Sequence, residues 1–177
     1  MIETRRPAFI DGKPKQLLID GKLVDALSGE TFQSTSPSTG ELVATFALAS
    51  AEDVDRAVRA ARAALDGPWS RFKPADRQAV LLRLADLVDA EFDDLALLDC
   101  IEMGRPITAA RGLRPMVQRS LRHFAGAATA IHGETLSNSA PVDLLSFTLR
   151  EPVGVVGALI PWNGPPFSAA RKVGPVL

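Results

Sequence analysis

The stretch Glu151-Pro-Val-Gly-Val-Val-Gly-Ala-Leu-Ile-Pro-Trp-Asn163 decides the fold class of this 177-residue chain. Residues 153–160 are apolar throughout, which is typical of a parallel β-strand that is covered on both faces. Pro161 ends the apolar run, and Trp162 and Asn163 follow it. Open α/β sheets bind ligands beyond the carboxyl ends of their strands. The stretch therefore predicts an α/β protein with a ligand site that includes Asn163.

The residues before this stretch predict short strands followed by four helices. A hairpin is expected over residues 17–24, because Asp20-Gly21 suits a tight turn. Ser50 and Asp53 are spaced as a capping box at the start of a helix, and the helix that begins at Pro74 carries a stripe of Val80, Leu84, Leu87 and Val88. The other expected elements are a loop over 34–40, a strand over 42–48, helices over 51–65, 91–104 and 113–131, a strand over 144–150 and a helix start in 165–177.

Composition excludes several classes of partner. The chain has 20 basic and 21 acidic residues, and this balance gives no electrostatic case for binding nucleic acid or an anionic membrane. The longest apolar stretch is about half of what a membrane span needs, and no secretory signal is recognisable. Cys100 is the one cysteine, which fits a reducing compartment. We expect a soluble cytoplasmic α/β protein.

Few residues carry chemistry by their spacing alone. Cys100 lies within a helical pattern and is expected to be a small buried hydrophobe rather than a nucleophile. His123 and His132 have no metal-ligand spacing, so we predict no metal site. Asn163 is open to two interpretations, because its carboxamide could contact a ligand or cap the following helix.

Several segments resemble the NAD(P)-dependent aldehyde dehydrogenase superfamily, and within it the betaine-aldehyde-like group. The likeness runs from about Leu17 to Leu177. It rests on Glu151–Gly157 with Pro161-Trp162-Asn163, Ile19-Asp-Gly-Lys, Pro37-Ser-Thr-Gly-Glu41, Asp53–Ala64, Phe124-Ala-Gly126 and His132-Gly133-Glu134. The resemblance implies the N-terminal part of the aldehyde dehydrogenase fold, with the first strand of an incomplete Rossmann-like cofactor-binding sheet.

The resemblance also implies a reaction and a cofactor. In this family a cysteine thiolate attacks an aldehyde, hydride passes to NAD or NADP, and the resulting thioester is hydrolysed to a carboxylic acid. Asn163 matches the family's asparagine that holds the oxyanion. Ile160, Pro161, Trp162 and Asn163 match positions that line the cofactor. Glu102 lies where relatives often carry a carboxylate near a structural cation.

The implied substrate tunnel differs from the common family pattern. Its expected residues are Met116, Gly164, Phe167, Ser168 and Arg171. Gly164 stands where an aromatic residue is common, and Ser168 and Arg171 stand where an apolar residue and a tryptophan are common. We expect a wider and more polar tunnel, suited to an anionic or hydroxylated aldehyde.

The resemblance divides the chain into a loose arm (1–15), a helical and strand part of the cofactor-binding domain (16–135), a segment like the family's oligomerisation strand (136–151) and the start of the nucleotide-binding sheet (152–177). The complete protein is expected to be a homo-oligomer. The family's catalytic cysteine and general-base glutamate lie beyond Leu177, so we expect an inactive N-terminal fragment of an aldehyde dehydrogenase. The alternative is a non-catalytic short product that acts as an interaction module or is an inert remnant.

Overall fold

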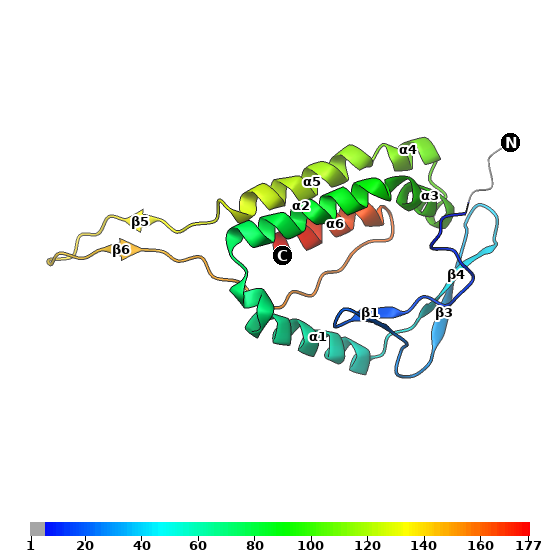
Figure 1. The fold of residues 1–177 in the computed structure, drawn as a ribbon, viewed down its shortest axis with the longest axis horizontal. Helices are drawn as coiled ribbons and strands as arrows, with labels where there is room; N and C mark the ends of the chain where they lie inside the picture. The colour runs from blue at the N-terminus through cyan, green and yellow to red at the C-terminus, as the bar shows by residue number, and fades with distance from the viewer. Residues whose placement is uncertain (1–5) are drawn as a thin grey trace.

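The computed structural model describes residues 6–177. A layer of helices lies on one side of the molecule, and α1 with two small hairpins lies on the other (Figure 1). A two-stranded arm, residues 134–149, projects away from both. In chain order the elements are β1 (Leu17–Ile19), β2 (Lys22–Val24), β3 (Thr31–Thr35), β4 (Leu42–Ala47), α1 (Ala51–Asp66), η1 (Pro68–Arg71), α2 (Pro74–Ala90), α3 (Phe92–Met103), α4 (Ile107–Arg111), α5 (Arg114–Ala128), β5 (Thr135–Leu136), β6 (Ser146–Phe147) and α6 (Pro165–Val176).

The N-terminal hairpins confirm part of the prediction. β1 and β2 pair antiparallel, and their turn places Asp20 at φ 52° and Gly21 at φ 69°, as a two-residue hairpin turn requires. β4 forms as expected, and its partner β3, for which no strand was predicted, extends over only the first two residues of the loop predicted at 34–40. Residues 1–5 of the predicted loose arm lie outside the described residues, and Lys15 pairs with β4 through its N–H and the Thr45 carbonyl, 2.7 Å apart.

The capping box at α1 forms as predicted. The Ser50 hydroxyl accepts from the Asp53 N–H at 3.3 Å, and the Asp53 carboxylate accepts from the Ser50 N–H at 3.0 Å. The same carboxylate accepts from the Leu27 N–H. Asp53 is therefore buried between α1 and the segment that follows β2.

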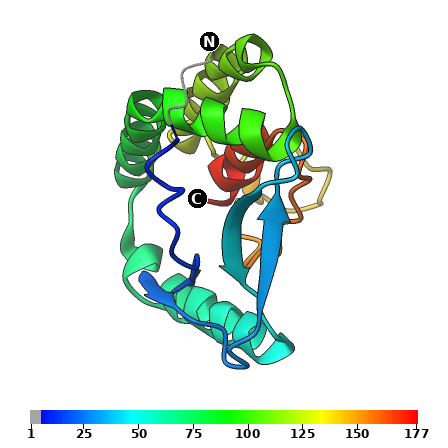
Figure 2. The same ribbon diagram turned by 90° about the vertical axis from the view of Figure 1, so that its right-hand side faces the viewer.

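The helical layer holds the core. α2, α5 and α6 run side by side, with α3 and α4 at one end (Figures 1 and 2). In α2 the most buried side chains are Leu81 and Ala85. Val80, Leu84 and Val88 of the predicted stripe are half-buried, and the last two pack against the core cluster. Only Leu87 is exposed, so the predicted stripe is confirmed in part. The seven buried residues of the core cluster are Ala85, Phe92, Ala96, Ala110, Val117, Leu121 and Ala170.

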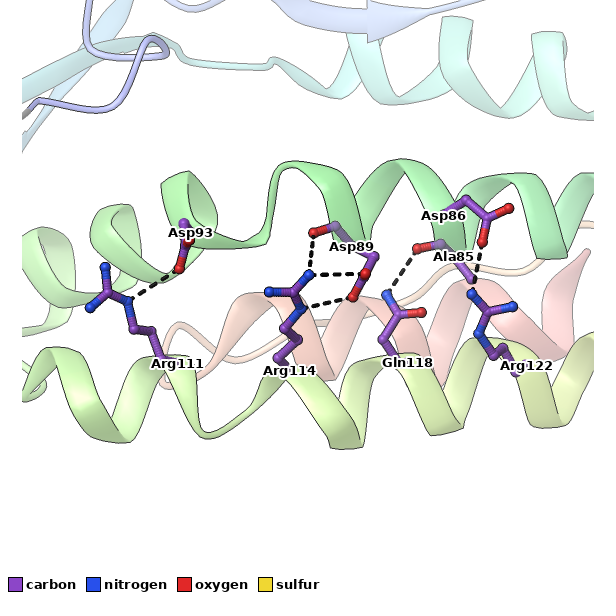
Figure 3. Close-up of polar contacts among 8 residues, drawn as sticks. All are labelled: Ala85, Asp86, Asp89, Asp93, Arg111, Arg114, Gln118 and Arg122. Atoms are coloured by element: carbon purple, nitrogen blue, oxygen red, sulfur yellow. Dashed lines mark hydrogen bonds and ion pairs between the residues drawn. The ribbon is translucent and has the colours of Figure 1, made fainter.

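A row of polar contacts fixes the register of α2 against α5 (Figure 3). Arg114 donates to both carboxylate oxygens of Asp89, at 2.8 and 2.9 Å. Arg122 donates to Asp86 at 2.7 Å, and Gln118 donates to the Ala85 carbonyl at 2.9 Å. These donors recur every four residues along α5, so they all face α2.

The strand predicted over residues 153–160 does not form. Residues 148–164 have no regular structure, and Val153 and Leu159 are 98% and 91% exposed. The physical reason is that a strand takes its hydrogen bonds from a neighbouring strand, and no described segment pairs with this one. The strand expected over 144–150 shrinks to β6, which pairs with β5 in the arm.

Candidate functional site

Asn163 lies in the loop that leads into α6. It is exposed, and within residues 6–177 its carboxamide makes no hydrogen bond. The N-cap of α6 is Gly164, and no side chain caps this helix. The interpretation in which Asn163 caps the helix was therefore wrong. Its carboxamide, which has two N–H donors and one acceptor, is free to contact a ligand.

The backbone of this loop is held by a residue from another part of the chain. Arg105 Nη2 donates to the main-chain carbonyl of Asn163 at 3.1 Å. Arg105 Nε lies 3.4 Å from Oδ2 of Asp99, a residue of α3. The side chains of Asp99 and Arg105 are 2% and 17% exposed. An ion pair between α3 and the turn that follows it is thus connected directly to the loop that carries Asn163.

The predicted cofactor positions are consecutive on the exposed segment before Asn163. Ile160, Pro161 and Trp162 are all exposed, and Trp162 is 77% exposed. They present an apolar and partly aromatic surface. The ring of a nicotinamide could lie against such a surface, so the residue types fit the cofactor implied by the sequence.

Four predicted tunnel residues share one face of α6. Phe167, Ser168 and Arg171 lie three, four and seven residues after the N-cap Gly164, which places them on one side of a helix. The guanidinium of Arg171 lies 5.5 Å from the centre of the Phe167 ring. Met116, the fifth, is exposed on the neighbouring helix α5.

A hollow of the helical layer lies on the opposite face of α6. It is a cavity of about 400 Å³ between α2, α3, α5 and α6. On α6 it is lined by Pro165, Pro166, Ala169, Ala170 and Val173. Helical periodicity directs these residues away from Ser168 and Arg171, so this cavity is distinct from the predicted tunnel.

Sequence reasoning missed Arg105 and Asp99. The signal that was available is Gly104-Arg105-Pro106, a constrained turn at the end of a helix, but nothing in it identifies a contact with a residue 58 positions away. Cys100 is partly buried within α3. Glu102 accepts a hydrogen bond from the Ser34 hydroxyl at 2.9 Å.

Within residues 6–177, no three His, Cys, Asp or Glu side chains are grouped so that they could hold a metal ion. None of the helices in this range is both long and apolar enough to cross a membrane.

Comparison with known proteins identifies the family. The sequence model of the aldehyde dehydrogenase family matches residues 23–177. The chain belongs to the aldehyde dehydrogenase family. Aldehyde dehydrogenase 1 of Tanacetum cinerariifolium is 46% identical over 169 residues, which are 94% of this chain and 34% of that protein. The family resemblance found in the sequence is thereby confirmed.

Solved aldehyde dehydrogenases share the fold. The NAD-dependent aldehyde dehydrogenase from Sinorhizobium meliloti superposes with a TM-score of 0.87 and 42% identity, covering 97% of this chain and 34% of the other. The NAD⁺ complex of the enzyme from Bacillus cereus gives 0.89 and 37%, covering 94% and 34%. The predicted fold class, the N-terminal part of the aldehyde dehydrogenase fold, is confirmed. The chain spans about a third of the length of these relatives.

Proposed function

We propose that this chain takes part in the oxidation of an aldehyde to a carboxylic acid with NAD or NADP, and that Asn163 holds the oxygen of the reacting aldehyde. The observation that carries the proposal is the exposed carboxamide of Asn163, which has no hydrogen-bond partner in residues 6–177 and stands beside an exposed apolar surface. A polar side chain left free next to such a surface is a common arrangement in ligand sites.

The role of Asn163 follows from the charge that develops in the reaction. When a nucleophile attacks an aldehyde carbonyl, the carbonyl oxygen becomes negative. A carboxamide N–H that already points at that oxygen stabilises the charge without reorganising, and one such donor typically contributes about 10²–10³ in rate. Cys100 is partly buried inside α3, so we infer that it is not the nucleophile.

We place the cofactor beside the same loop. Ile160, Pro161 and Trp162 would hold NAD or NADP, which accepts a hydride when it is bound. The apolar character of the three side chains supports this placement, and the B. cereus relative was solved with NAD⁺. The contribution of these residues is to bind the ring and to exclude water from the aldehyde.

Two side chains of α6 indicate the class of substrate. Ser168 and Arg171 give the α6 face polar and cationic character, so we propose an anionic or hydroxylated aldehyde as substrate.

The arm carries exposed apolar side chains and is the proposed contact between copies in a homo-oligomer. The cytoplasm remains the proposed location, because a single cysteine suits a reducing compartment.

The decisive experiment introduces a substitution of Asn163 into the gene and isolates the variant polypeptide from its natural source. Asn163→Ala should lower kcat for aldehyde oxidation by about 10²–10³, while the Kd for NAD changes little. The matched control is Asn138→Ala, which removes a carboxamide that bonds within the arm: it donates to the Leu144 carbonyl and the Ser146 hydroxyl and accepts from the Ala140 N–H. A kcat for Asn163→Ala close to that of wild type would contradict the proposal. A natural 18.9 kDa product without activity on any aldehyde would favour the non-catalytic alternative.

A further inference from the structure

We propose that Arg105 is a positioning residue for Asn163, fixed in turn by the buried carboxylate of Asp99. This inference rests on the proposed function, since it concerns the orientation of the same carboxamide. The link runs from α3 through the guanidinium to the carbonyl of Asn163, and it brings together segments that are 58 residues apart in the chain.

The Asn163 loop requires such a contact because its own backbone is permissive. Gly164 has φ 135° and ψ 54°, a conformation that glycine adopts readily and L side chains rarely adopt. Without a side chain at residue 164, local sterics leave the Asn163–Gly164 peptide several orientations. That peptide determines where the Asn163 side chain points. The donor bond from Arg105 to the Asn163 carbonyl, 3.1 Å long, selects one orientation.

The position of Arg105 is fixed from both sides along the chain. Gly104 ends α3 in the left-handed conformation, with φ 76°. A Cβ at Gly104 would lie 3.2 Å from Pro37 Cγ and 3.3 Å from Ser38 Oγ, so the turn packs closely against the β3–β4 loop. Pro106 restricts the backbone of the residue before it. The guanidinium therefore starts from a rigid backbone.

Asp99 fixes the other end of the side chain. Its carboxylate is almost fully buried, and neither oxygen has a hydrogen-bond partner in the described part of the chain. Arg105 Nε, 3.4 Å from Oδ2, is the cation that faces it. A buried carboxylate attracts a neighbouring guanidinium more strongly than an exposed one does, because less water screens the pair. Arg105 Nη2 also lies 3.4 Å from Met103 Sδ. Nε thus faces Asp99, and Nη2 contacts both Met103 Sδ and the Asn163 carbonyl.

The rival interpretation is that Arg105 only joins α3 to the start of α6 and supports the fold. The two interpretations differ in how the substitutions combine. If Arg105 acts by orienting Asn163, its loss should matter only while the Asn163 carboxamide is present. If it supports the fold, its loss should add to the loss of Asn163.

The experiment is a double-mutant cycle on kcat in the natural polypeptide. Arg105→Met should lower kcat by about 10-fold or more, since a shift of about 1 Å in a reacting group can cost about 10². The KM for the aldehyde should change little. Arg105→Met should cause no further loss in the Asn163→Ala background. Arg105→Lys, which retains the charge and one donor toward Asn163, should restore most of the activity. The matched control is Arg111→Met, which breaks an exposed pair with Asp93, also on α3.

A second readout does not depend on catalysis. Hydrogen exchange of the backbone amides of residues 162–168 should become faster in Arg105→Met and stay unchanged in Arg111→Met. Unchanged exchange in Arg105→Met, or additive losses of kcat in the cycle, would overturn the inference. If Asn163→Ala itself leaves kcat unchanged, the proposed function fails instead. The exchange measurement then still decides whether Arg105 holds the loop.

Discussion

Gly174 of α6 lies directly against the ring of Phe124 of α5. A Cβ at Gly174 would stand 2.4 Å from Phe124 Cδ2, 2.9 Å from Cγ and 3.1 Å from Cβ. Because two of these atoms lie close to the α5 backbone, the ring cannot relieve the contact by rotating. The two helices that carry the proposed tunnel residues therefore approach as closely as they do because residue 174 is glycine.

Gly174→Ala is expected to destabilise the protein. Overpacking of this kind costs about 1–3 kcal/mol, and the better helix propensity of alanine offsets at most about 1 kcal/mol of that. The free energy of unfolding, measured by denaturant titration, should fall by about 1 kcal/mol or more.

The control for this substitution is Gly126→Ala. Gly126 lies in α5, and beyond its chain neighbours and the adjacent turns of its own helix backbone no atom comes within 4 Å of its hypothetical Cβ. At residue 126 only the higher helix propensity of alanine has an effect, so the free energy of unfolding should rise by about 0.5–1 kcal/mol. A Gly174→Ala variant as stable as Gly126→Ala would show that α6 can move away from α5 at no cost.

A second prediction concerns acid stability and Asp53. The Ser50 backbone N–H is the strongest influence that lowers the pKa of this carboxyl below its ordinary value of 3.8, helped by the Ser50 hydroxyl, the Leu27 N–H and Arg56. Folding therefore favours the carboxylate. The stability from Asp53 is fully present above pH 3.8 and is lost as the pH falls toward the lower folded value.

Asp53→Asn should consequently lower the melting temperature at neutral pH, and the difference from wild type should shrink below pH 3.8. Asp55→Asn is the control for loss of a carboxylate from α1, because it removes only an exposed pair with Arg59. Such a pair contributes about 0–1 kcal/mol. A difference between wild type and Asp53→Asn that is constant with pH would mean that the cap does not depend on the charge of Asp53.

The elements that were predicted well are those whose hydrogen bonds are local. The capping box at Ser50 and the glycine that ends α3 each depend on residues that are close in the sequence, and both formed as expected. β3 was missed because its residues are mostly exposed and its identity depends on pairing with β4. Residues 153–160 have the composition of a buried strand. Such a composition is expected of a strand that pairs with a neighbouring strand inside a sheet, and no described segment pairs with these residues.

In the candidate site, too, the features that depend on local sequence were predicted and those that depend on distant contacts were not. Asn163 was identified from its place after an apolar run, but sequence reasoning could not decide between a ligand contact and a helix cap. The structure excludes the helix cap, because Gly164 and not Asn163 is the N-cap of α6. The contact from Arg105 to the Asn163 carbonyl lay beyond prediction, since it depends on how α3 and α6 pack.

A third prediction concerns the arm. Leu145 is 78% exposed, and Phe147 and Leu149 are also exposed. Side chains of this size are normally covered when a protein assembles. Leu145→Asp should weaken self-association of the natural polypeptide by about 10-fold or more, as measured by light scattering across a concentration series. Leu23→Asp changes an equally apolar exposed residue on β2 and should leave association unchanged. Equal behaviour of the two variants would exclude the arm as the contact.

The last prediction concerns substrate choice. Arg171 presents its guanidinium on the same α6 face as Ser168, and the Phe167 ring lies beneath it. A hydrogen bond to a charged group contributes about 1.5–3 kcal/mol. Arg171→Leu should therefore lower kcat/KM for aldehydes that carry a carboxylate by about 10-fold or more, since about 1.4 kcal/mol corresponds to a factor of ten. The value for neutral aldehydes of the same length should change much less.

Arg122→Leu is the matched control, because Arg122 is an exposed arginine on α5 that pairs with Asp86 of α2. It should alter neither substrate preference nor kcat/KM. Ser168→Ala tests the hydroxylated class separately, since it removes the hydroxyl and retains the cation. A wild-type protein that strongly prefers long aliphatic aldehydes would contradict the polar-tunnel proposal. An apolar chain gains nothing from an unpaired guanidinium, and burying that charge beside it would be unfavourable.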